Sequence, residues 1–130
     1  MAKLTLFAYA EGADLEKVAE SFEARFDALV AGRTWVTKDI WVVNQRVPGP
    51  PPEWDLGINL AVAAKRGRLP AWIDDVVAIA GTFAELHGET GRKFVIGIHD
   101  GKGDTTKDLF VIDSATPDLA TLRAALGGVQ

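Results

Sequence analysis

The chain has 130 residues, 48% of them hydrophobic and 25% charged, which is the size and composition of one ordinary globular domain spanning residues 1–130; the order of its predicted elements makes it an α+β domain. Cysteine is absent, which excludes a disulfide scaffold, a thiol nucleophile and any cysteine-ligated metal. The net charge of −4 provides no positive field to gather nucleic acid. We expect a soluble, cytoplasmic protein without membrane contact, because neither a signal-peptide pattern nor an apolar run of membrane-spanning length occurs.

The first half of the chain predicts a strand, a helix and two further strands. Residues 3–10 carry apolar side chains on both faces, which is typical of an interior strand. Apolar positions with a 3.6-residue period then follow Asp14, a capping residue, and stop at Gly32. Thr34–Val47 is rich in β-branched and aromatic residues, and Asp55–Ala63 alternates strictly, so each predicts a strand. The proline-rich segment between these strands predicts a stiff loop.

The second half predicts a helix, a hairpin and a last helix. Pro70 suits a first helical turn, and the largely apolar segment that follows ends near Gly88 or Gly91. Lys93–His99 and Asp108–Asp113 read as strands joined by a glycine-containing turn. A Thr-Pro-Asp sequence at 116–118 is a helix-start signature, and the short apolar stripe after it ends at a pair of glycines.

The resulting order is β-α-β-β-α-β-β-α. Its first six elements match a split βαβ arrangement, so we predict an antiparallel sheet with helices packed on one face, a ferredoxin-like core extended by a C-terminal strand and helix. Phe22 and Phe26 lie on the apolar stripe of the first helix and are predicted to face the sheet. Such a fold hosts many functions, so it does not identify one.

The sheet face opposite the helices is a candidate binding surface. If the helices cover the face bearing Leu6 and its neighbours, the other face carries Tyr9, Asp55, Asn59 and His99 among apolar residues and two glycines. Aromatic and polar groups on one surface suit a small ligand or the side chains of a partner. The alternative is that the C-terminal helix covers this face.

A second candidate surface surrounds Trp54, which directly follows the prolines. A rigid loop presents an aromatic side chain at little cost in conformational entropy, and binding hot spots favour such anchors. The flanking acidic residues Glu53 and Asp55 favour a basic partner. The alternative is that Trp54 folds back over the prolines.

A third candidate is the basic turn with Lys65, Arg66 and Arg68, which comes just before a predicted helix N-terminus, where an anion is favoured. Residues 60–69 resemble the strand-turn-helix of GNAT-type acetyltransferases, a resemblance that implies coenzyme A binding. The sequence departs from that pattern at Leu69–Pro70, because proline removes an N–H donor. The alternative is a solvated basic turn.

No known catalytic, cofactor or metal motif is present in the sequence. His99, Asp100, Asp104 and Asp108 lie within ten residues, but their spacing lacks the pattern of a calcium loop and is typical of a hairpin turn. His87 is expected to interact with the last carbonyl groups of its helix. We therefore predict no catalytic residues, no metal and no cofactor.

Two functional hypotheses follow. The acidic balance and the missing catalytic motifs favour a small protein-interaction module that binds another protein, similar in type to inhibitors, antitoxins and bacterial toxin-immunity proteins. The alternative is a small-molecule-binding or acyl-transfer enzyme that uses the helix-free sheet face or the Lys65–Arg68 turn.

Overall fold

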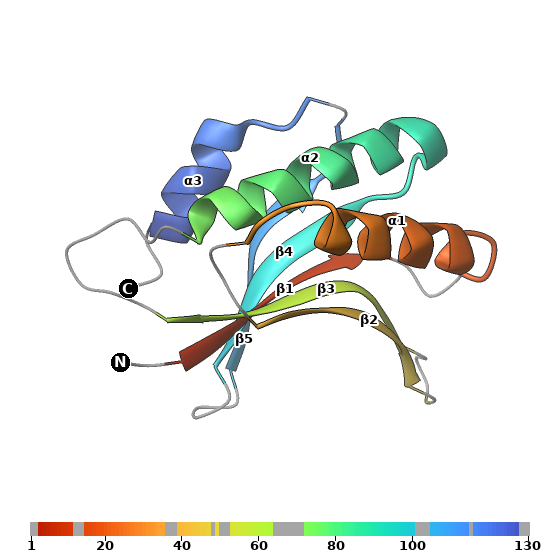
Figure 1. Cartoon of the computed structure of the whole chain (residues 1–130), viewed down its shortest axis with the longest axis horizontal. Helices are drawn as coiled ribbons and strands as arrows, with labels where there is room; N and C mark the ends of the chain where they lie inside the picture. Colours follow the sequence, from red (N-terminus) through yellow and green to blue (C-terminus); the bar gives the residue numbers. More distant parts are fainter. Residues whose placement is uncertain are drawn as a thin grey trace.

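Three helices lie on one face of a five-stranded sheet in the computed structural model of the chain (Figure 1). The structure describes residues 3–11, 15–35, 39–47, 49, 53–63, 72–100, 105–114 and 116–127. The elements follow in the predicted order: β1 (Lys3–Ala10), α1 (Ala19–Ala31), β2 (Ile40–Val47), β3 (Glu53–Ala63), α2 (Ile73–Thr90), β4 (Phe94–Asp100), β5 (Thr105–Ile112) and α3 (Leu119–Gly127).

The sheet is open and antiparallel, with the strand order β2-β3-β1-β4-β5. β1 lies at its centre, where Leu6 pairs with Leu60 of β3 on one side and with Ile98 of β4 on the other. This confirms the interior strand that two apolar faces indicate. β4 and β5 form the expected hairpin, which a bulge interrupts between Ile96 and Gly97.

The core lies between the sheet and the helices, on the face that the alternation of the strands predicts. Its sheet side is formed by buried aliphatic and aromatic residues of the three central strands: Leu6, Ala8, Ala10, Leu56, Ile58, Leu60, Phe94 and Ile96. Phe22 and Phe26 of α1 are 1% and 0% exposed, which confirms their prediction as core residues. Phe83 of α2 stacks on Phe94 with ring centroids 4.4 Å apart, so aromatic contacts join both long helices to the sheet.

The helix ends follow the predicted signals in part. Gly91 ends α2 with a φ of 74°, a left-handed conformation that favours glycine, and His87 Nδ1 lies 2.9 Å from the Arg92 carbonyl oxygen just beyond. Asp118 accepts hydrogen bonds from the backbone N–H groups of Ala120 and Thr121 at the start of α3. The predicted starts at Asp14 and Pro70 lie outside the described residues.

Three predicted strand starts are wrong, one of them that of β5, which begins at Thr105 instead of Asp108. The strand expected from Thr34 begins at Ile40, because Trp35 packs back on α1, where its Nε1–H donates to the Val30 carbonyl oxygen at 2.9 Å. β3 begins at Glu53 instead of Asp55, so Trp54 belongs to a strand.

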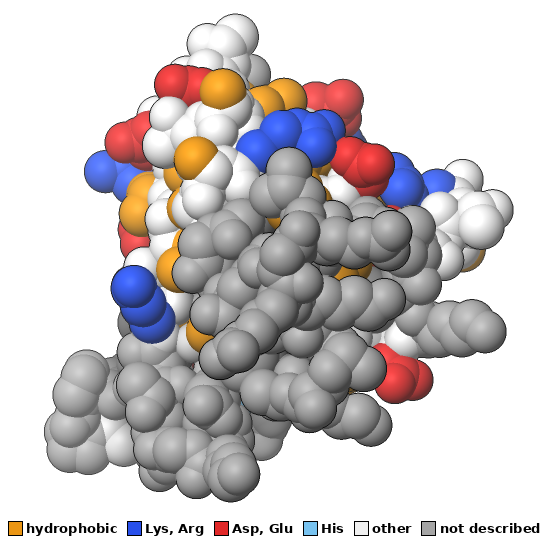
Figure 2. All heavy atoms as spheres, turned by 90° about the vertical axis from the view of Figure 1, so that its left-hand side faces the viewer, with side chains coloured by type: hydrophobic (Ala, Val, Ile, Leu, Met, Phe, Trp, Pro, Cys, Tyr) orange, Lys and Arg blue, Asp and Glu red, His pale blue; other side chains and the backbone are white. Residues whose placement is uncertain are grey.

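Ion pairs tie the helices together on the outside of the core. Arg25 of α1 contacts Glu85 and Glu89 of α2 at 3.1 and 3.0 Å, and Arg33 reaches the fully buried Asp75 at 3.3 Å. Figure 2 shows basic and acidic side chains interleaved on the described part of one end of the molecule. Among the described residues, no helix is long and apolar enough to span a membrane.

Candidate functional site

The sheet face opposite the helices carries no described helix. α3 packs against α2 and β5 on the helical side, with Leu122 in the core, so the expectation that the C-terminal helix covers the other face is wrong (Figure 1). The strand register places Tyr9, Asn59 and His99 on this helix-free face, as the sequence predicts.

Tyr9, Asn59 and Asp55 form one group on this face. Tyr9 pairs with Gly57, which separates Asp55 and Asn59 along β3. The pKa of the Tyr9 hydroxyl is raised above its ordinary value, mainly by partial burial. The Asp55 carboxylate also raises this pKa, and a hydrogen bond from Asn59 partly offsets the increase. Asn59 Oδ1 is buried and has no hydrogen-bond partner among the described residues. The group therefore contains one unused acceptor.

His99 lies apart from this group. It pairs with Thr5, which is four residues from Tyr9 along β1 and so roughly 13 Å away. The ring is half-buried and makes contacts of its own. The structure thus brings three of the four predicted polar residues together and leaves the histidine at the other end of β1.

The two glycines of this face do not open a hollow for a ligand. A side chain at Gly97 would overlap the ring of Phe7 and the Lys107 carbonyl oxygen, and one at Gly57 would overlap the backbone of Ala8. Phe7 is only 8% exposed although it lies on the helix-free face. Its ring covers Gly97 and packs against the Tyr9 ring, with ring centroids 5.2 Å apart. The glycine positions are filled, and this part of the face offers contact area to a partner instead of a cavity.

Exposed apolar side chains lie near both edges of the same face. Trp41 of β2 is 43% exposed and pairs with Asn59, while Val111 of β5 is 42% exposed and pairs with Val95. Trp41 is not among the site residues predicted from the sequence, although its alternation with Val43 on β2 is a readable signal. An exposed tryptophan on a sheet face is a typical anchor for a protein partner.

Trp54 lies on the opposite, helical side of the sheet. Its Nε1–H donates to Asn44 Oδ1 at 2.8 Å, and the guanidinium group of Arg46 lies 4.0 Å from the centre of its ring. The ring also packs against the core. The loop position assumed for Trp54 is therefore wrong, and Asp55 points to the face opposite to Trp54.

The remaining predicted sites lie largely outside the described residues. Lys65, Arg66, Arg68 and Asp104 belong to segments that the structure does not describe, and the side chain of Glu53 is likewise outside it. Within the described ranges, no three histidine, aspartate or glutamate side chains cluster as metal ligands.

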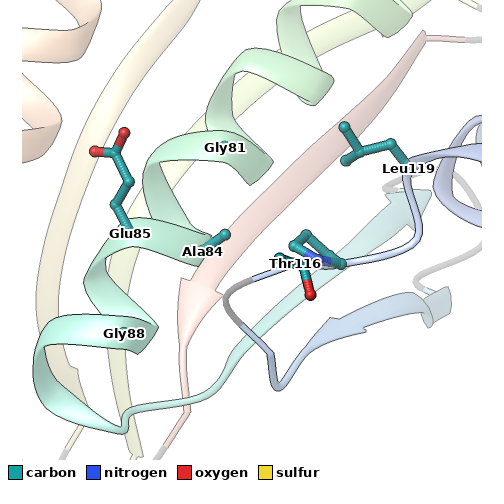
Figure 3. A pocket seen from close by; sticks show the side chains of 7 residues that line it. Gly81, Ala84, Glu85, Gly88, Thr116 and Leu119 are labelled. Atoms are coloured by element: carbon teal, nitrogen blue, oxygen red, sulfur yellow. The ribbon is translucent and has the colours of Figure 1, made fainter.

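A shallow groove of about 480 Å³ runs between α2 and the segment that leads into α3 (Figure 3). Gly81, Ala84 and Gly88 form its floor on α2, and Thr116 and Leu119 line the other side. Its lining is mainly apolar and contains one carboxylate, Glu85, which pairs with Arg25. The groove offers packing space without a group that selects a ligand.

Comparisons with known proteins find no match: no family model fits the chain, and neither the curated proteins nor the solved structures contain a significant relative.

Proposed function

We propose that this chain is a small protein-interaction module that binds a partner protein through its helix-free sheet face. The observation that carries the proposal is the combination of Trp41, 43% exposed, with half-buried side chains on the same face, among them Tyr9 and Val95. A sheet face with an exposed aromatic anchor suits a macromolecular partner, whereas small ligands favour a concave site. An inhibitor, antitoxin or immunity protein would act through such a surface.

The charges of this face favour a basic partner. Its charged side chains among the described residues include Asp55 and Asp108, both carboxylates. Complementary charge increases the association rate more than the affinity, so binding to the partner should slow as salt concentration rises.

The strand order supports a finer assignment of the fold. β2-β3-β1-β4, with α1 connecting β1 to β2 and α2 connecting β3 to β4, is the arrangement of a split βαβ core. We assign the core as ferredoxin-like, with β5 and α3 as its extension.

The test of this function uses photo-crosslinking from Gln45, an exposed residue on the face of Trp41. Partners captured in the source cells are purified and titrated with the wild-type chain, with Trp41→Ala and with Leu119→Ala. Leu119 is the matched control, because it is 37% exposed but lies on α3. Trp41→Ala should weaken binding about thirtyfold, the effect of losing roughly 2 kcal/mol at a hot spot, and Leu119→Ala should change it less than twofold. Equal effects of the two substitutions would refute the face as the binding site.

A small polar ligand is the second candidate, and Asn59 favours it. The unpartnered Oδ1 lies beside Tyr9 and is buried, so a donor group of a ligand would reach it after a neighbouring side chain moves aside. Thermal stabilisation of the wild-type chain by a metabolite, lost in Asn59→Ala, would support this candidate against the interaction module.

A further inference from the structure

The two edges of the sheet differ in how they are protected against pairing with another strand. β5 has a bulge between Phe110, which pairs with Ile96, and Asp108, which pairs with Gly97. It also carries the exposed side chains of Lys107 and Asp108 and lies beside α3. β2 pairs with β3 over eight residues without a bulge or proline, and Arg46 is its only charged residue. Bulges and charges are the features that keep edge strands from pairing, so β2 is the more open edge.

The ladder identifies which backbone groups of β2 face outward. The Ala61 N–H donates to the Asp39 carbonyl oxygen at 2.9 Å, in register with the β2–β3 pairs. Residues alternate in an antiparallel ladder, so the odd-numbered positions of β2 direct their N–H and C=O groups to β3. The even-numbered positions Ile40, Val42, Asn44 and Arg46 direct theirs to the outer edge. No described segment pairs with that edge.

A row of carboxylates lies above this edge. Glu16, in the turn before α1, and Glu20, Glu23 and Asp27 of α1 fall within an arc of about 60° on the helix, which we call the acidic flank. Arg25, on the other side of α1, contacts α2, whereas Glu16 contacts Arg46 at 3.0 Å and Glu23 accepts from Asn44 at 2.6 Å. The acidic flank therefore faces the β2 side.

Two carboxylates of the acidic flank remain available. Arg46 neutralises Glu16, but Glu20 and Asp27 are exposed and have no ion-pair partner among the described residues. A second copy paired along β2 would bring two acidic flanks together, which like-charge repulsion disfavours. A strand with basic side chains on this side meets opposite charge instead.

We propose that β2 accepts an extended, basic segment of the partner protein as a sixth strand of the sheet. The segment pairs with the outward backbone groups of Val42 and Asn44, places alternate basic side chains toward the acidic flank, and places the intervening apolar ones beside Trp41. This inference rests on the interaction function proposed above and specifies the chemistry of the partner.

The probe is an end-capped eight-residue peptide of alternating lysine and valine, with alternating glutamate and valine as its counterpart. The lysine peptide should bind the wild-type chain at least tenfold more tightly, and this preference should shrink with salt. Equal binding of the two peptides would overturn the assignment of a basic partner.

Backbone pairing is tested with Asn44→Pro against Asn44→Ala. Both lose the same side-chain contacts, but only proline removes the outward N–H, and edge strands tolerate proline there. Peptide affinity should fall at least tenfold in Asn44→Pro relative to Asn44→Ala, with both folds verified by circular dichroism. Independently of any variant, saturating peptide should slow hydrogen exchange at the Val42 and Asn44 amides at least tenfold and leave Val43 unchanged. Unchanged exchange at Val42 and Asn44 would overturn strand pairing.

The other outcomes separate the two proposals. A crosslinked partner that requires Trp41 but binds Asn44→Pro as well as Asn44→Ala refutes strand pairing and keeps the interaction function. If no protein is captured, the interaction function fails even though the peptide binds. A dimer that Asn44→Pro converts to monomer would make a second copy the occupant and overturn the basic partner.

Discussion

Replacing Trp54 decides between a packing role and a binding role for this residue. The sequence suggests a partner-binding anchor, whereas the structure holds the indole between Asn44, Arg46 and the core. Trp54→Ala should therefore destabilise the fold, and its effect on partner binding should follow only from the loss of folded protein.

The magnitude follows from three contacts. The hydrogen bond from Nε1–H to Asn44 contributes about 0.5–1.5 kcal/mol, and the Arg46 cation–π contact at 4.0 Å about 0.5–1 kcal/mol at an exposed site. Partial burial of the ring adds about 1–2 kcal/mol. Trp54→Ala should cost about 2–4.5 kcal/mol, and Trp54→Phe, which keeps most of the packing, about half as much.

Chemical denaturation followed by far-ultraviolet circular dichroism measures both variants without relying on tryptophan emission. Trp41→Ala is the matched control and should cost about 1 kcal/mol, less than Trp54→Ala, because Trp41 is 43% exposed. Unchanged stability of Trp54→Ala together with weakened partner binding would refute the packing role and restore the anchor that the sequence suggests.

Three further predictions concern the helix-free face, a glycine of α2 and residues 100–108. The pKa of Tyr9, the only tyrosine, should lie above its ordinary value in an absorbance titration, and Asp55→Asn should lower it. Because the pKa is higher in the folded state than in the unfolded state, the free energy of unfolding should fall as pH rises above about 10. An increase in the free energy of unfolding over this pH range would contradict the burial of the ring. Gly97→Ala should destabilise by about 1–3 kcal/mol through overlap with neighbouring atoms. Gly81→Ala, with open space around the added methyl group, should stabilise α2 by about 0.5–1 kcal/mol. Equal effects of Gly97→Ala and Gly81→Ala on the free energy of unfolding would contradict the packing at Gly97. EDTA should leave the melting temperature unchanged, and a decrease that calcium restores would identify a metal site among residues 100–108.

The periodic parts of the fold could be predicted because each side chain's face depends on its own position in a repeating element. The alternation of Leu56, Ile58 and Leu60 determines which side of β3 is buried, and the spacing of Phe22 and Phe26 determines which side of α1 meets it. No knowledge of distant residues is needed for either conclusion.

The candidate site depended on distant residues, and there the sequence was insufficient. Gly97 looks like free space along the chain, but the ring of Phe7 from another strand fills it. Trp54 looks like a loop residue after the prolines, but Asn44 and Arg46 across the hairpin hold it in β3. In both cases, strand pairing decides where an aromatic ring packs, and composition does not encode pairing.

The acidic flank also combines a feature that the sequence shows with one that only the fold shows, and this bears on function. Its spacing at positions 16, 20, 23 and 27 is readable in the sequence, but only the topology places it above the open edge at β2. Because the carboxylates disfavour a second copy at this edge, they protect it against self-pairing in the way that bulges and charges protect β5. The same carboxylates attract a basic strand, so one set of charges opposes self-association and selects the proposed partner.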